Sequence, residues 1–165
     1  MSYLTSLLGR TVCAIVIFGT IAISSNAYAE DSQMLGIEAG TSGVMFGSGG
    51  YGQKLTLLTY RYNKNWYYLG GEVGGWEGTR GALVTGWQVG VQYKGFSLGT
   101  GLAGINHQTK YLGTSWQILS TLRYTFQPIP VFVSWNHISN GSKIFGSPLP
   151  NIGENFFTVG YVYRF

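Results

Sequence analysis

The chain has 165 residues, of which 10% are charged and 16% are aromatic, and its formal net charge is +4 at pH 7. A soluble domain averages about 25% charged residues, and a disordered chain is richer in charge and poorer in aromatics. The composition therefore disfavours both classes and is typical of one β-domain with a largely apolar exterior; without a basic cluster, no nucleic-acid partner is expected.

Residues 1–29 are similar to a cleaved secretory signal peptide. Arg10 supplies a positive charge, "TVCAIVIFGTIAI" is apolar, and the small residues Ala27 and Ala29 form the A-x-A pattern of a cleavage site. The alternative is an uncleaved anchor, but a spanning helix needs about 20 apolar residues. We expect cleavage after Ala29. Cys13 is the only cysteine, so the mature chain, 30–165, has no disulfide and no thiol nucleophile.

The mature chain contains eight stretches in which large apolar residues alternate with small or polar ones. Such a period of two indicates β-strands. In the fourth stretch, for example, Leu83, Trp87 and Val89 share one face, whereas Gly86 and Gln88 share the other. The pattern predicts an all-β fold, with strands at approximately 33–46, 53–62, 66–77, 82–93, 96–106, 114–126, 131–139 and 155–165.

Periodicity alone fits either a soluble sandwich or a membrane barrel with its bulky face toward lipid. Three features favour the barrel. Aromatic residues gather near strand ends, tight connections ("NKN", "KG", "QPIP") alternate with mostly longer ones, and the chain ends in the alternating aromatics of "YVYRF". That ending is similar to the signal, here at Phe165, that the outer-membrane insertion machinery reads. We therefore predict an eight-stranded antiparallel transmembrane β-barrel of the bacterial outer membrane, with both termini periplasmic.

The interior of such a barrel is just wide enough for side chains. We expect the inward polar residues to pair with one another, with Glu38 and Glu72 opposing some of Arg61, Arg123 and Arg164. A wide diffusion pore is not expected.

The stretch "SWNHISNGS", residues 134–142, raises the question of catalysis. A strand places His137 and Ser139 on one face, about 6.7 Å apart along the chain, where they could act as a base and a nucleophile. Glu154 is the one acidic residue after Glu77, and the strand that it begins is the expected neighbour, so it could orient the imidazole. The alternative is an ordinary turn on a non-catalytic barrel, an anchor or adhesin. His107 is interpreted as solvated loop surface.

The pattern "NHISNGS…PNIGEN" resembles the C-terminal signature of the lipid A 3-O-deacylases, small acyloxyacyl hydrolase-like barrels of the Gram-negative outer membrane. The matching residues are His137, Ser139, Asn140, Pro150, Asn151, Gly153 and Glu154. The resemblance implies that Ser139 attacks the ester at the 3-position of lipid A, that His137 transfers the proton, and that Glu154 holds the ring.

For the oxyanion, the resemblance implies donors from Asn140 or Asn151, with loop N–H groups such as that of Gly141. The implied partner is lipid A, or lipopolysaccharide, in the outer leaflet; phospholipid is an alternative substrate for the same triad, and a homodimer is possible. No cofactor is expected, and no ligand cluster has the spacing of a metal site.

Two features depart from the family pattern. The loop between Ser139 and Glu154 is longer, and strict alternation back from Phe165 places Glu154 on the inward face, whereas His137 is on the outward face. Three alternatives remain open at this point: a bulge between Glu154 and Val159, a Glu154 that belongs to the loop, or Asn155 in the position opposite the histidine.

Overall fold

The computed structural model of the protein describes residues 31–44, 52–77, 82–106, 114–141, 144–145 and 153–165. The predicted signal peptide, His107, Pro150 and Asn151 lie outside these ranges. Within the described ranges, no helix has the length and apolarity needed to cross a membrane.

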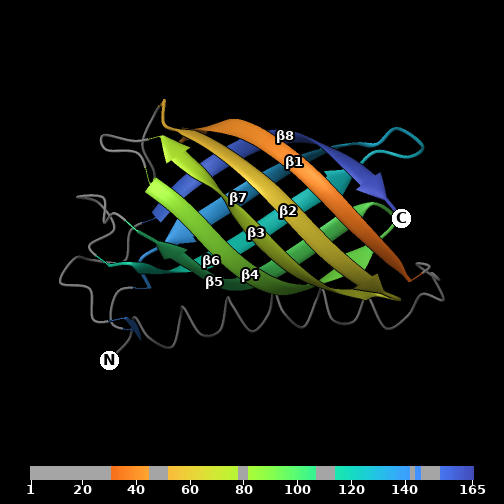
Figure 1. The fold of residues 1–165 in the computed structure, drawn as a ribbon, viewed down its shortest axis with the longest axis horizontal. Coiled ribbons are helices and arrows are strands. Elements are labelled where there is room, and N and C mark those ends of the chain that lie inside the picture. Colours follow the sequence, from red (N-terminus) through yellow and green to blue (C-terminus); the bar gives the residue numbers. More distant parts are fainter. Residues whose placement is uncertain (1–30, 45–51, 78–81, 107–113, 142–143, 146–152) are drawn as a thin grey trace, which may run out of the picture.

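Eight antiparallel strands close into one barrel, in which each strand pairs with its neighbours in sequence and β8 returns to β1 (Figure 1). The chain is therefore all-β, as predicted. The strands are β1 (Ser32–Gly43), β2 (Lys54–Lys64), β3 (Tyr67–Glu77), β4 (Ala82–Tyr93), β5 (Phe96–Ile105), β6 (Trp116–Thr125), β7 (Val131–Ser139) and β8 (Gly153–Arg164).

The predicted strands agree with the observed ones to within about three residues at each end. One turn is shifted: β2 continues through Lys64, so the β2–β3 turn is made by Asn65 and Trp66 instead of "NKN". Asn65 has a φ of 54°, a left-handed conformation that asparagine tolerates better than most residues. Trp66, expected to begin β3, thus lies in the turn.

The β4–β5 connection is the two-residue hairpin that "KG" predicts. Lys94 and Gly95 have φ angles of 46° and 86°, and positive φ at both positions matches the twist of the flanking strands. The C-terminus lies at the same end of the barrel as the start of β1 and the end of β2 (Figure 1).

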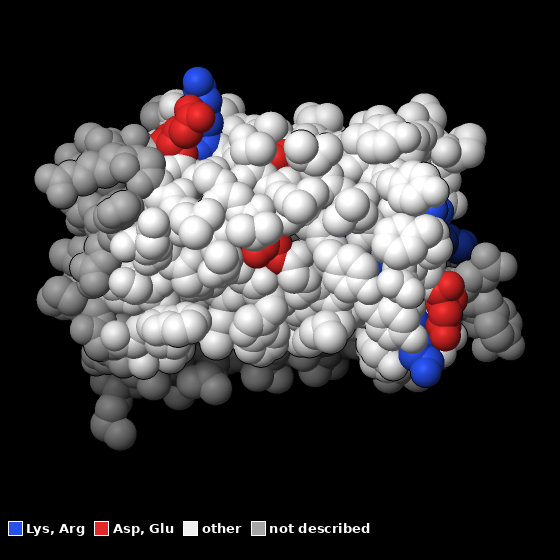
Figure 2. Space-filling model, in the orientation of Figure 1, with Lys and Arg blue, Asp and Glu red and all other residues white. Residues whose placement is uncertain are grey.

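The outer wall of the barrel is apolar. Val159 is 60% exposed, and many other large apolar side chains face outward in the same way along the strands. Charged side chains gather mainly at the two ends of the face shown in Figure 2, and the wall between them is largely uncharged. A soluble protein rarely exposes so large an apolar surface, so the barrel is consistent with one that sits in a membrane.

The middle of the interior is filled by a polar network. Arg123 Nη2 lies 2.7 Å from Glu38 Oε1, and the Glu38 carboxylate also accepts hydrogen bonds from Ser134, Asn136 and Thr158. The expected ion pairing is confirmed for Glu38. Each of these groups is buried, so the network packs polar side chains together inside the barrel.

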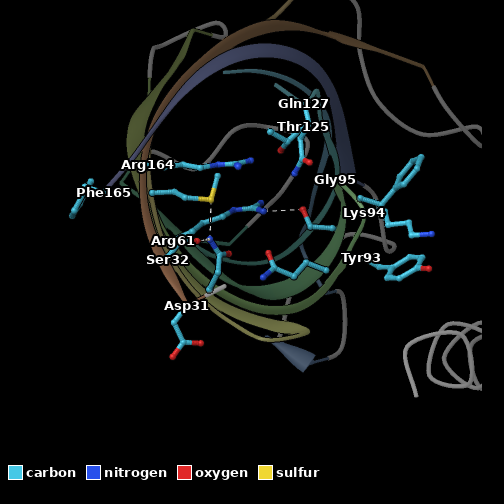
Figure 3. A pocket seen from close by; sticks show the side chains of 15 residues that line it. Asp31, Ser32, Arg61, Tyr93, Lys94, Gly95, Thr125, Gln127, Arg164 and Phe165 are labelled. Atoms are coloured by element: carbon cyan, nitrogen blue, oxygen red, sulfur yellow. Dashed lines mark hydrogen bonds between the residues drawn. The ribbon is translucent and has the colours of Figure 1, made fainter. Parts of the chain in front are cut away.

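Among the described residues, Glu72 and Arg61 form no salt bridge, and the hydrogen bonds given for them are to neutral side chains. Glu72 accepts a hydrogen bond from Gln88, and Arg61 donates one of 2.8 Å to Ser97 and lies over the ring of Tyr68. Beyond Arg61 the interior opens into a cavity of about 740 Å³ at the end that holds the C-terminus. Arg61 and Arg164 point into this mouth, whereas Lys94 points away from it (Figure 3).

Candidate active site

His137 and Ser139 lie on β7, near the end of the barrel opposite the C-terminus. Trp135, His137 and Ser139 share the outward face, and Phe132, Ser134, Asn136 and Ile138 face inward and are buried, which is the division that alternation predicts. Across the β6–β7 pair, His137 is opposite Ser120. Across the β7–β8 pair, His137 is opposite Asn155 and Ser139 is opposite Gly153.

The imidazole of His137 is held by the strand next to it. Its Nδ1 atom lies 2.8 Å from Asn155 Oδ1, and the indole Nε1 of Trp135 donates to the same oxygen at 3.1 Å. The rings of Trp135 and His137 are stacked, with centroids 5.8 Å apart and planes 27° apart. Asn155 is almost fully buried beneath them, so the histidine is fixed at one nitrogen and on one face.

The other edge of the ring lies over Gly153. A Cβ atom at residue 153 would lie 2.6 Å from His137 Cε1 and 2.8 Å from His137 Nε2, closer than real Cβ contacts allow. The imidazole of His137 can occupy this position because Gly153 has no side chain. Because Gly153 is the cross-strand partner of Ser139, Nε2 is on the side of the ring that faces the serine's position in the strand pair.

Ser139 ends β7 and is 7% exposed. Among the described residues, no hydrogen bond joins its hydroxyl to the imidazole. Same-face neighbours in a strand are about 6.7 Å apart, and catalytic hydrogen bonds are often long before substrate binds. Because the imidazole is held by Asn155 and Trp135, an approach of the two groups depends on the Ser139 side chain.

Glu154 lies on the inward side of β8, opposite Ile138. Its Oε1 atom accepts a hydrogen bond of 3.2 Å from Gln53 Nε2, and the side-chain oxygen Oε1 of Gln53 in turn accepts one from the indole N–H of Trp76. The β7–β8 register continues without interruption from Val131 opposite Tyr161 to Ser139 opposite Gly153. Of the three alternatives for this segment, the geometry is that of the third: Asn155 is opposite the histidine.

Asn140 and Gly141 follow directly after Ser139. Asn140 is fully buried, and Gly141 has a φ of 59°, a conformation that favours glycine. The carbonyl of Gly141 accepts a hydrogen bond from Ile144 N, and a Cβ atom at residue 141 would lie 2.8 Å from the ring of Phe145. The chain thus turns sharply beside the serine, while Asn151, the other amide that the resemblance implies, lies outside the described residues.

The sequence places Trp135 in the apolar outward row but does not predict its contacts with Asn155 and His137. The available signal was the parity of Asn155, which predicts that an amide faces His137. An aromatic residue two positions before a histidine on the same face can stack on it, but the sequence does not indicate where its N–H will point.

No protein-family model matches the chain, and the search of curated proteins finds no match. Within the described part of the chain, no group of three or more His, Cys, Asp or Glu residues could hold a metal ion.

Proposed function

We propose that this protein is an outer-membrane serine esterase that hydrolyses the ester-linked 3-hydroxyacyl chain at the 3-position of lipid A. The observation that carries the proposal is the hydrogen bond between His137 Nδ1 and Asn155 Oδ1 on the outward wall of the barrel. It leaves Nε2 as the edge of the ring on the side of Ser139. A histidine held at one nitrogen, with a serine beside the other, is the arrangement of a general base and its nucleophile.

In this mechanism the Ser139 hydroxyl attacks the ester carbonyl while His137 Nε2 takes its proton. The tetrahedral intermediate collapses, the C–O bond to the sugar breaks, and the imidazolium returns the proton to the sugar hydroxyl. Water then attacks the acyl-serine with His137 again as base, and the 3-hydroxy fatty acid leaves. Asn155 takes the orienting position for which the resemblance implied Glu154.

The oxyanion would be stabilised by donors at the turn that follows β7. The backbone N–H groups near Gly141 and the amide of Asn140 lie next to Ser139 in the chain, and Asn151 remains a predicted donor. Removing one such donor typically costs about 2.7–4 kcal/mol in the barrier.

The position of the site supports a lipid substrate. Trp135 and His137 are part of the apolar wall, with Phe157 opposite Trp135 on β8 and 48% exposed. An acyl ester within the leaflet can reach this wall laterally. The interior does not offer a comparable route, because the network around Glu38 fills it.

Lipid A mass spectrometry of cells that express the protein tests the proposal. We expect loss of one 3-hydroxyacyl chain, and Ser139→Ala should abolish that loss while the barrel still assembles. Ser120→Ala is the matched control, because Ser120 is also outward-facing and is opposite His137 on β6; it should retain activity.

Unchanged lipid A with the assembled wild-type barrel would favour a non-catalytic anchor or adhesin. Release of fatty acid from phospholipid, measured in the same samples, would instead assign the same residues to a different ester. Normal deacylation by Ser139→Ala would show that the nucleophile is another residue.

A further inference from the structure

We infer that Trp135 is a positioning residue that sets the tautomer of His137 through the side-chain carbonyl of Asn155. This inference rests on the proposed function for its consequence in catalysis. The hydrogen bonds that carry it do not depend on any substrate.

The first step concerns the orientation of the Asn155 amide. An amide oxygen and nitrogen are hard to distinguish by shape, and their assignment follows from the hydrogen-bond network. The indole N–H of Trp135 is a donor and never an acceptor, and its partner at 3.1 Å is Asn155 Oδ1. The atom between Trp135 and His137 is therefore the carbonyl oxygen, because the NH₂ group in that position would face a second donor.

The second step concerns the proton on the imidazole. The same Oδ1 atom lies 2.8 Å from His137 Nδ1, and a carbonyl oxygen has two lone pairs, enough for both contacts. Since the oxygen only accepts, Nδ1 must carry the hydrogen. A neutral imidazole has one N–H, so Nε2 carries the lone pair. Nε2 is also the atom over Gly153, on the side of Ser139, where a general base must accept a proton.

The third step concerns the plane of the ring. The indole is stacked on the imidazole at an interplanar angle of 27°, so one side chain both supports the ring and directs its hydrogen-bond partner. Asn155 is almost fully buried on the outward wall. A neutral amide there avoids the cost of burying an ionised carboxylate in an apolar environment. A carboxylate presents an oxygen in either orientation, whereas the amide presents its oxygen to His137 because Trp135 donates a hydrogen bond to that oxygen.

Loss of the indole N–H removes one of the interactions that hold the Asn155 oxygen toward His137, so it favours the opposite arrangement. In the part of the population that adopts it, the Asn155 amide is turned by 180° and presents its NH₂ group to Nδ1, which becomes the acceptor. The proton moves to Nε2, and Nε2 in that form cannot take a proton from Ser139. Trp135→Phe removes the N–H while keeping an aromatic ring for the stack, so it separates the hydrogen bond from the packing.

The test is ¹⁵N NMR of histidine-labelled protein in detergent micelles, with a tag that contains no histidine. The His107→Gln background leaves His137 as the single imidazole of the chain. In the neutral form we expect the Nδ1–H tautomer. Trp135→Phe should shift a measurable part of the population to Nε2–H and lower the deacylation rate on the order of tenfold, the scale of one lost hydrogen bond.

Trp87→Phe is the matched control. Trp87 also faces outward, at 51% exposure on β4, and the change should leave both the tautomer and the rate unchanged. An Nε2–H tautomer in the parent protein, or a Trp135→Phe spectrum like that of the parent, would overturn the inference. An Nδ1–H tautomer that shifts in Trp135→Phe, in a protein that leaves lipid A intact, would support the positioning role and reject the esterase.

Discussion

The imidazole of His137 lies in the space that any side chain at Gly153 would need. The two residues come from neighbouring strands and are offset by two positions in the register, since His137 is opposite Asn155 and Gly153 is opposite Ser139. The absence of a side chain at Gly153 thus leaves room for the imidazole next to the position of Ser139. The geometry of the proposed site thus depends on a residue that has no side chain.

We predict that Gly153→Ala lowers deacylation strongly, by on the order of tenfold or more, because its Cβ would displace the Cε1–Nε2 edge of the imidazole. A kinetic assay on lipid A in mixed micelles measures the change. Gly75→Ala is the control, because a Cβ there meets nothing within 4 Å and should leave the rate unaltered. Equal rates for both variants would mean that the ring has another productive position.

Glu154 and Asn155 make separable predictions. Asn155→Ala removes the acceptor of His137 Nδ1 and should reduce the deacylation rate at least about tenfold. Glu154→Gln keeps the size of an inward side chain and can still bond to Gln53, so most of the activity should remain. The rates of the two purified variants decide between the residues; a severe loss in Glu154→Gln alone would restore the carboxylate to the orienting role.

Removing the carboxylate of Glu38 should destabilise the barrel. Glu38→Leu leaves the buried guanidinium of Arg123 without its ion-pair partner, which typically costs about 3–5 kcal/mol. Urea titration in detergent, followed by tryptophan fluorescence, measures the free energy of unfolding. Glu77→Gln is the control, because its pair with Lys54 is largely exposed and such pairs contribute less than about 1 kcal/mol. Similar midpoints for the two variants would contradict the structural role of the network.

The apolar wall predicts a depth-dependent cost for a charge. Val159 is near the middle of β8 and 60% exposed, so Val159→Arg should destabilise a barrel in lipid vesicles by about 2–4 kcal/mol. Tyr163→Arg, close to the strand end, should cost about 1 kcal/mol or less. Equal and small effects at both positions, measured by refolding into vesicles, would indicate a wall that faces water.

Much of the fold was predictable because alternation in each strand is long and regular. The inward position of Glu38 and Arg123 and the outward position of Trp135 follow from parity alone. Closure of the barrel brings inward charges together, but an ion pair forms for Glu38 and Arg123, whereas the hydrogen bonds of Glu72 and Arg61 are to neutral side chains. The predicted turn begins two residues too early, at Asn63, because asparagine favours turns, whereas Asn63 and Lys64 are the last residues of β2.

The site was predictable in part. Parity placed His137 and Ser139 on one face and offered Asn155 as an alternative to Glu154. It could not select between them, because that choice depends on whether β8 pairs without a bulge as far as Gly153, which is a property of the register between two strands. The hydrogen bond of Trp135 depends on a side-chain rotamer, which no sequence pattern specifies.

The polar plug around Glu38 has a kinetic consequence for a reaction on the outer wall. For the proposed esterase, the buried polar network in the barrel interior favours a substrate that meets the protein by diffusion within the plane of the leaflet, with the released fatty acid returning to that plane. The rate should then follow the mole fraction of substrate in the surface and fall as inert lipid is added, even when the amount of substrate per volume stays constant.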